Sequence, residues 1–100
     1  MSLEINKAKS YLGFAIKSKS IRYGVDDICK LKKAEIIIVS SDLQSSSFNK
    51  ISNYSIKKNI EILKLSIDDF QNLLDNKSVK VLAILDANLA SAIKKNLTNL

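Results

Sequence analysis

Basic, acidic and turn-forming residues are concentrated in one short segment of this 100-residue chain. Residues 17–27 have the sequence K-S-K-S-I-R-Y-G-V-D-D, which places cationic side chains beside a lone glycine and two adjacent carboxylates. Lysine and arginine neutralise phosphates, whereas a carboxylate helps to bind nucleic acid only where it accepts hydrogen bonds from base edges. The segment is therefore suited to contacts with both the backbone and the bases of RNA.

The predicted interface residues in this segment and just after it have different roles. They are Lys17, Lys19, Arg22, Gly24, Asp26, Asp27 and Lys30. The first three are expected to contact phosphates, which sets affinity but not sequence preference. The two aspartates and Lys30 are expected to face bases, although acids in the first turn of a helix also suit the helix dipole. Tyr23 fits either a base-stacking role or a place in the core.

The charge of the chain is unevenly distributed. Residues 1–33 hold eight basic and three acidic residues, a net charge of +5, while residues 34–100 hold eight basic and seven acidic residues, a net charge of +1. Most of the whole-chain charge of +6 thus lies in one third of the sequence. Such an uneven distribution favours a polyanionic partner over a merely solvated surface.

Several kinds of chemistry are disfavoured by composition. The chain has no histidine, so it lacks the commonest general base and the commonest zinc ligand. Cys29 is the single cysteine, which excludes an internal disulfide, and we expect it to be a small buried hydrophobic residue. No phosphate-binding glycine motif occurs, and the pairs at 26–27 and 68–69 lie at predicted helix starts, where acids are favoured anyway. We expect no catalysis, no cofactor and no metal.

The periodicity of apolar residues predicts alternating helices and strands. Helices are expected over 2–17, 25–32, 44–56, 66–76 and from Asp86 or Asn88 to 97, and strands over 20–23, 35–40, 59–65 and 79–85. The strands 35–40 and 79–85 are continuous apolar runs of the kind that helices cover on both faces. This order predicts an α/β fold, a three-layer α/β/α sandwich with a central mixed four-stranded sheet.

Local signals add four expectations. Asp42 and Ser66 are predicted to cap the helices that follow them. Gly24 provides the turn into the second helix. Gly13 lies inside a predicted helix, where glycine costs about 1 kcal/mol relative to alanine, so a close backbone contact is expected there.

The length of the chain suits one domain spanning residues 1–100. Its longest apolar runs, 36–39 and 81–85, are far shorter than the roughly 20 residues that span a bilayer. Residues 1–10 lack the apolar stretch of a secretion signal. We therefore expect no membrane association and a cytoplasmic location.

The chain resembles the ribosomal protein L-seven-Ae and L-thirty-e family of kink-turn RNA binders, especially its small bacterial YlxQ-like branch. The residues that carry the resemblance are 12–15 (L-G-F-A), 17–24, 36–42 and 83–86 (A-I-L-D). It covers approximately residues 7–97. The resemblance implies a three-layer α/β/α protein that recognises sharply bent RNA.

Two features of the family carry over onto numbered residues. The G-x-N-E-x-x-K signature at the start of the second helix aligns with residues 24–30, so Gly24 and Lys30 match, while Asp26 replaces the asparagine and Asp27 keeps the acidic charge. An ionised aspartate only accepts hydrogen bonds, so the donor of the asparagine is lost. A loop before the last helix implies further contacts from Asp86, Ala87 and Asn88, where Asp86 equally fits a helix cap. The segment 24–42 is about three residues shorter than in the family, which implies a shortened second helix.

The sequence thus predicts a non-enzymatic protein that binds structured RNA, ribosomal or another noncoding RNA, with the ribosome as a candidate partner. The chain gives no reason to expect more than a monomer. The alternative is a protein-interaction module of the same fold that has lost RNA recognition, with Asp26 and Asp27 meeting a basic partner.

Overall fold

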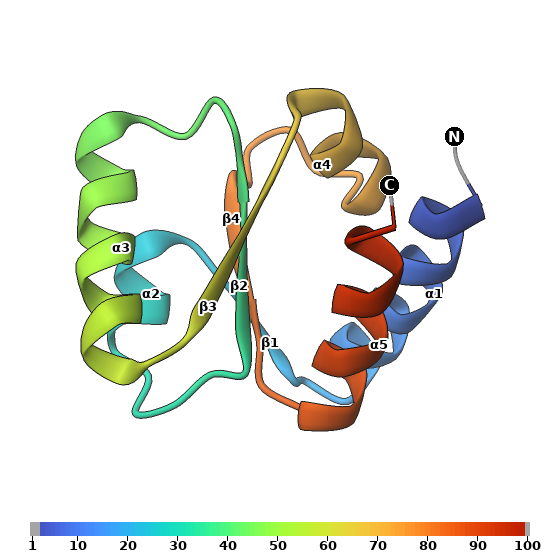
Figure 1. Ribbon diagram of the computed structural model, residues 1–100, viewed down its shortest axis with the longest axis horizontal. Helices are drawn as coiled ribbons and strands as arrows, with labels where there is room; N and C mark the ends of the chain where they lie inside the picture. Colours follow the sequence, from blue (N-terminus) through green and yellow to red (C-terminus); the bar gives the residue numbers. More distant parts are fainter. Residues whose placement is uncertain (1–2, 100) are drawn as a thin grey trace.

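The computed structural model describes residues 3–99, in which helices and strands follow one another in the predicted order (Figure 1). The elements are α1 (Leu3–Lys17), β1 (Ile21–Tyr23), α2 (Val25–Cys29), β2 (Ile36–Ser40), α3 (Ser45–Lys58), β3 (Glu61–Leu65), α4 (Ile67–Leu73), β4 (Val81–Ile84) and α5 (Ala87–Leu97). Ser2, where the first helix was expected to begin, lies outside the described residues.

The strands form one mixed sheet with the order β1-β4-β2-β3. β2 pairs in parallel with β3 and antiparallel with β4, and β1 pairs antiparallel with β4. Every residue of β2 and β4 is buried, which confirms that the two continuous apolar runs are the central strands. The predicted mixed four-stranded sheet is therefore confirmed.

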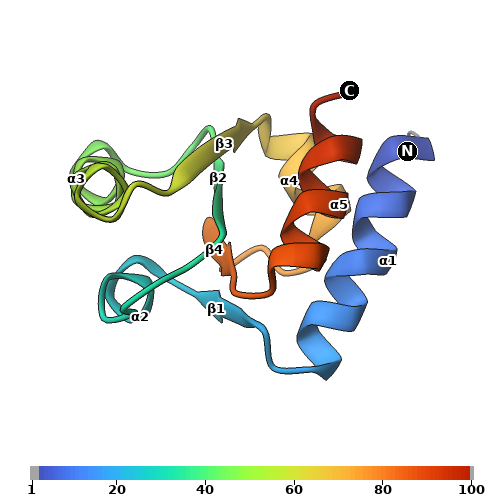
Figure 2. The ribbon, with the colours of Figure 1, turned by 60° about the horizontal axis from the view of Figure 1, so that its bottom comes forward.

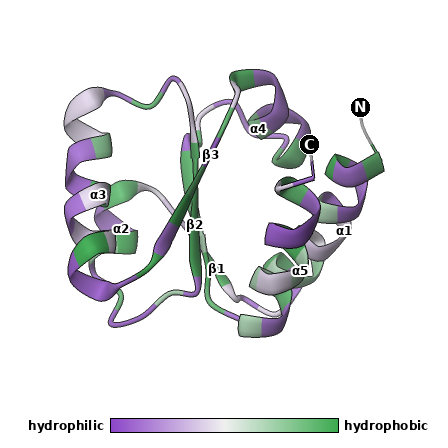
Figure 3. Ribbon diagram, in the orientation of Figure 1, coloured by the Kyte–Doolittle hydropathy of each residue, from purple (hydrophilic) through white to green (hydrophobic). Residues whose placement is uncertain are grey.

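Helices cover both faces of this sheet, as the three-layer α/β/α prediction requires (Figures 1 and 2). α2 and α3 lie on one face, where Ile28 and Ile51 pack against Ile37 and Val39. α1, α4 and α5 lie on the other face over Ile36, Ile38, Leu82 and Ile84. The strands form the apolar centre between the two helical layers, and hydrophilic residues lie mainly toward the outside (Figure 3).

The predicted helix ends agree with the structure at some caps and differ at others. Ser66 caps α4 by accepting from the backbone N–H of Asp69 at 3.1 Å, as predicted. Asp86, rather than Asn88, caps α5 by accepting from the N–H of Leu89 at 2.9 Å. The expected cap at Asp42 is wrong, because α3 begins after Gln44 without a side-chain cap.

Two further expectations need correction. α2 ends at Cys29, about a turn before the predicted end near residue 32, and only Ile28 of this helix is buried. The close contact expected at Gly13 is absent, since a Cβ atom built there would meet nothing within 4 Å. None of the helices formed by residues 3–99 is long and apolar enough to cross a bilayer.

Candidate nucleic-acid interface

The register of β1 separates the predicted interface residues into two groups. The N–H of Gly24 donates to the carbonyl of Val81 at 3.1 Å, so α2 starts beside the first residue of β4. At the other end of β1, the N–H of Leu85 donates to the carbonyl of Ser20 at 2.8 Å. We name these the Gly24 end and the Asp86 end. Ser20 and Gly24 are four positions apart along the extended chain, which corresponds to about 13 Å.

Gly24 makes the turn that starts α2. Its φ of 84° and ψ of 147° lie where a side chain is strained, although a Cβ atom would have open space around it. The carbonyl of Gly24 accepts from the N–H of Ile28 at 3.1 Å, which closes the first turn of the helix. The predicted role of Gly24 as the turn residue is confirmed, and Asp26 and Asp27, which follow the turn, are exposed.

Asp26 does not stand alone at the Gly24 end. Its carboxylate oxygen Oδ1 lies 2.6 Å from the Nζ of Lys50, which α3 contributes. The hydrogen bond and charge of Lys50, helped by the charge of Lys30, hold the pKa of Asp26 below its usual range. The same pairing raises the pKa of Lys50. An acceptor and a donor therefore lie next to one another on the surface.

Asp27 and Lys30 complete the charged surface of α2. Both residues are exposed, and no hydrogen bond or ion pair engages either side chain within residues 3–99. The backbone N–H of Lys30 donates to the carbonyl of Asp27 at 3.3 Å, and that of Leu31 donates to the carbonyl of Ile28 at 3.0 Å, so the helix ends here. The Gly24 end thus offers one free carboxylate and one free ammonium group beside the Asp26–Lys50 pair.

The structure adds a neighbouring segment that the sequence alone did not associate with α2. Residues 74–80 lead into β4 and therefore arrive beside Gly24. Lys80 in this segment forms an ion pair with Asp42 at 2.7 Å, and Ser40 donates a second hydrogen bond to that carboxylate. The hydrogen bond from Lys80, and to a smaller extent that from Ser40, lowers the pKa of Asp42. These contacts explain why Asp42 does not cap α3.

At the Asp86 end, the basic residues predicted to contact phosphates are exposed. Lys17 is the last residue of α1, and Lys19 follows it in the left-handed conformation with φ of 59°. The N–H of Ser20 reaches back to the carbonyl of Ala15 at 2.8 Å, a helix ending that usually places glycine at the left-handed position. Arg22 lies on the edge strand, with its guanidinium 2.9 Å from the carbonyl oxygen of Ile21.

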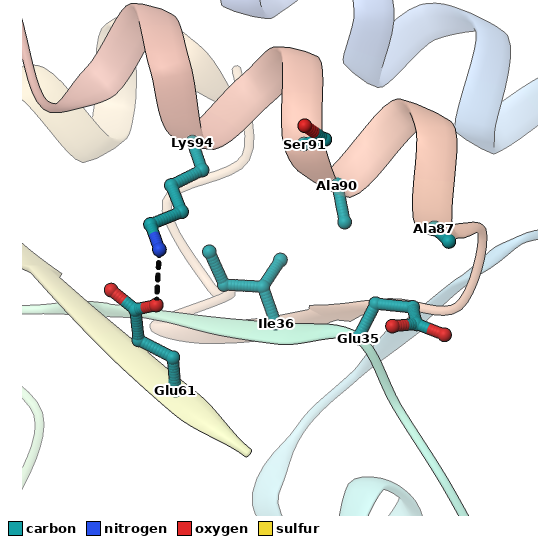
Figure 4. A pocket seen from close by; sticks show the side chains of 7 residues that line it. All are labelled: Glu35, Ile36, Glu61, Ala87, Ala90, Ser91 and Lys94. Carbon is teal, nitrogen blue, oxygen red and sulfur yellow. Dashed lines mark hydrogen bonds and ion pairs between the residues drawn. The ribbon is translucent and has the colours of Figure 1, made fainter.

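The three residues implied by the family loop, Asp86, Ala87 and Asn88, lie with these basic residues and not with Asp26 and Asp27. The carboxylate of Asp86 is engaged in capping α5, while Ala87 and Asn88 are exposed. Ala87 also borders a pocket of about 240 Å³ that contains Glu35 and Glu61 (Figure 4). Lys94 from α5 lies 2.6 Å from Glu61 across this pocket. Because carboxylates repel phosphates, the pocket itself is a poor place for an RNA backbone.

The structure shows how far Tyr23 and Cys29 are buried. Tyr23 is 36% exposed on the edge strand β1, so it is available to a stacking partner and does not belong to the core. Cys29 is half-buried and packs against the apolar cluster under α2 and α3, close to the expected core position. Burial is the main cause that raises the pKa of its thiol. No three His, Cys, Asp or Glu side chains among residues 3–99 are placed to hold a metal ion.

Comparisons with known proteins agree with this architecture. No protein-family model matches the chain, and no curated protein matches it. A protein of unknown function from Bacillus halodurans superposes with a TM-score of 0.78 at 17% identity, covering 92% of this chain and 97% of that one. The Giardia lamblia 15.5 kD RNA-binding protein superposes with a TM-score of 0.66 at 12% identity, covering 99% of this chain and 89% of that one. At these identities the likeness shows a shared fold.

Proposed function

We propose that this chain is a non-catalytic protein that binds structured RNA, and that the Gly24 end is its principal contact. The observation that carries the proposal is the composition of α2. This helix buries only Ile28 and leaves its charged residues exposed around the turn at Gly24. The face of this five-residue helix that carries Asp26 and Asp27 takes no part in the core, so it is better explained by what these side chains bind.

The side chains at the Gly24 end provide the donors and acceptors that base recognition needs. Asp27 accepts from the N1 and N2 hydrogens of a guanine, while Lys30 donates to acceptors such as O6 or N7. Lys50 supplies an ammonium donor next to Asp26, whose carboxylate cannot donate. The Asp26–Lys50 pair thereby replaces the combined donor and acceptor of an asparagine.

We propose a sharply bent RNA of the kink-turn type, within a ribosomal or other noncoding RNA, as the target. The resemblance of residues 24–30 to the kink-turn signature supports this proposal, as does the fold shared with an RNA-binding protein from Giardia lamblia. The positive residues at the Asp86 end, Lys17 and Lys19, add phosphate contacts when the RNA extends along β1. A monomer in the cytoplasm, with the ribosome as a candidate assembly, fits this role.

Alanine substitution at Lys50 tests whether the Gly24 end binds the RNA. Lys50→Ala is expected to weaken binding of a kink-turn RNA, because the donor beside Asp26 is removed. Lys58→Ala is the matched control, since it removes the same charge from the exposed last residue of the same helix. Equal losses from both variants, measured by fluorescence anisotropy at several salt concentrations, would mean that only overall charge matters and that the Gly24 end is not the site.

A further inference from the structure

We propose a second RNA site in the groove between α1 and α5, which takes unpaired nucleotides that extend from the structured RNA. The class of partner rests on the proposed function, whereas the position of the site rests on the groove itself. α1 and α5 lie side by side on the sheet face opposite α2 and α3 (Figures 1 and 2). The groove is therefore separate from the Gly24 end.

The groove is large enough for a nucleotide ligand and has a mixed lining. Its volume is about 610 Å³, within the roughly 300–1,000 Å³ of small-molecule sites. Its lining comes from both helices and includes, besides the small side chain of Ala92, those of Lys7, Ser10, Tyr11, Phe14, Lys95 and Asn96. This set combines aromatic rings, ammonium groups and polar groups, which are the three kinds of group that unpaired nucleotides use.

The aromatic residues provide a stacking surface. Tyr11 and Phe14 are three residues apart in α1, so their side chains lie on the same face of the helix. Phe14 is 57% exposed and Tyr11 is 37% exposed, although the core beneath the helix is well filled by Leu12 and Ala15. Their exposed rings can stack on bases of any sequence, because every base has an aromatic face.

The charges around these rings suit a nucleic-acid backbone. Lys7 and Lys95 line the groove from opposite helices, no acidic residue lines it, and neither lysine has an ion-pair partner in the part of the chain that the structure describes. Asn96 uses its amide N–H to donate to the carbonyl of Ala92 at 2.9 Å, so its side-chain oxygen remains to accept. A protein partner fits less well, since lysine is depleted in protein interfaces.

Binding of a short fluorescein-labelled oligouridylate tests the groove directly. Phe14→Ala should weaken this binding about fivefold or more, the loss expected for one stacked base. Lys7→Ala should lower the slope of log affinity against log salt by roughly 0.7, the value for one phosphate of a single strand. The matched controls on the same helix are Ile16→Ala and Lys9→Ala, which are exposed but lie outside the groove lining, and these should leave the binding unchanged.

Binding of a kink-turn RNA with blunt ends distinguishes failure of the groove proposal from failure of the proposed function. Its binding should be unaffected by Phe14→Ala, because it has no unpaired extension for the groove. If it binds while the oligouridylate does not, the groove proposal fails alone, and if neither RNA binds, the proposed function fails as well. Equal effects of Phe14→Ala and Ile16→Ala, or a dimer of the unaltered protein that Phe14→Ala dissociates, would also overturn the groove proposal.

Nuclear magnetic resonance of the unaltered protein gives a test that does not depend on the folding of any variant. Added oligouridylate should shift the signals of Lys7, Phe14 and Lys95. Shifts confined to the Gly24 end would assign the single strand to that end and overturn the groove.

Discussion

The ammonium group of Lys50 lies 2.6 Å from a carboxylate oxygen of Asp26, which links α3 to the first turn of α2. The two side chains are 58% and 79% exposed, so a partner can reach both without disturbing the core. Exposed ion pairs contribute little to folding stability. The pair therefore contributes little to the fold, which is consistent with the recognition role that we propose for it.

Lys50→Ala should raise the pKa of Asp26 toward its ordinary value of 3.8 without a marked change in thermal unfolding. Asp26 is charged at neutral pH in both proteins, and the lowered pKa of the unaltered protein extends the charged form to more acidic pH. The stabilisation that this pairing provides is present above the unfolded pKa and is lost as the pH falls through the lower folded value. A carboxyl titration followed by nuclear magnetic resonance measures both proteins, and an unchanged Asp26 midpoint would show that the pair does not form in solution.

Lys30→Ala and Lys17→Ala should weaken RNA binding in different ways. Loss of a base contact from Lys30 should cost about 1–3 kcal/mol for the specific RNA. Loss of a phosphate contact from Lys17 should lower the salt slope by roughly one and affect all structured RNAs alike. Titrations at several salt concentrations distinguish the two patterns, and unchanged binding by the Lys30 variant would remove that residue from the interface.

Lys19→Gly should make the protein more stable and its RNA binding weaker. The left-handed backbone at Lys19 costs a residue with a side chain roughly 1–2 kcal/mol, and glycine avoids much of this cost. The lost charge should at the same time reduce the salt dependence of binding. Urea unfolding and an RNA titration of the same variant give both values. A stabilised variant with unchanged RNA binding would exclude Lys19 from the phosphate contacts.

Alanine should have opposite effects at the two glycines of the chain. Gly24→Ala should destabilise the fold by about 1–3 kcal/mol, because the backbone there has φ of 84°. Gly13→Ala is the matched control and should stabilise it by about 0.5–1 kcal/mol, since Gly13 is helical and has open space for a Cβ atom. Urea unfolding measures both. Stabilisation by Gly24→Ala would mean that the turn into α2 does not need glycine.

The order of elements could be predicted because it depends on local patterns. The buried runs around Ile36–Ser40 and Val81–Ile84 have few polar interruptions, and this alone identifies them as central strands. The cap at Ser66 follows from the residue type and its position before an apolar helix face. These signals lie within a few residues of each other, so no tertiary information is needed.

The arrangement of the interface could not be predicted in this way. Lys50 pairs with a residue 24 positions away, and Lys80 pairs with Asp42 across 38 positions, so local spacing gives no sign of either contact. The ion pair with Lys80 also engages the carboxylate of Asp42 that was expected to cap α3. The division of the predicted residues between two ends depends on the register of β1 against β4, which the sequence does not specify.

Titration of the protein against a kink-turn RNA and an unbent duplex of equal length, at two salt concentrations, tests the central claim most directly. We expect tight binding to the kink-turn RNA that persists at the higher salt, and weak, strongly salt-dependent binding to the duplex. Equal and salt-sensitive binding to both RNAs would contradict recognition of bent RNA by the Gly24 end. Absence of binding to either would contradict the RNA-binding account itself and favour the protein-interaction alternative.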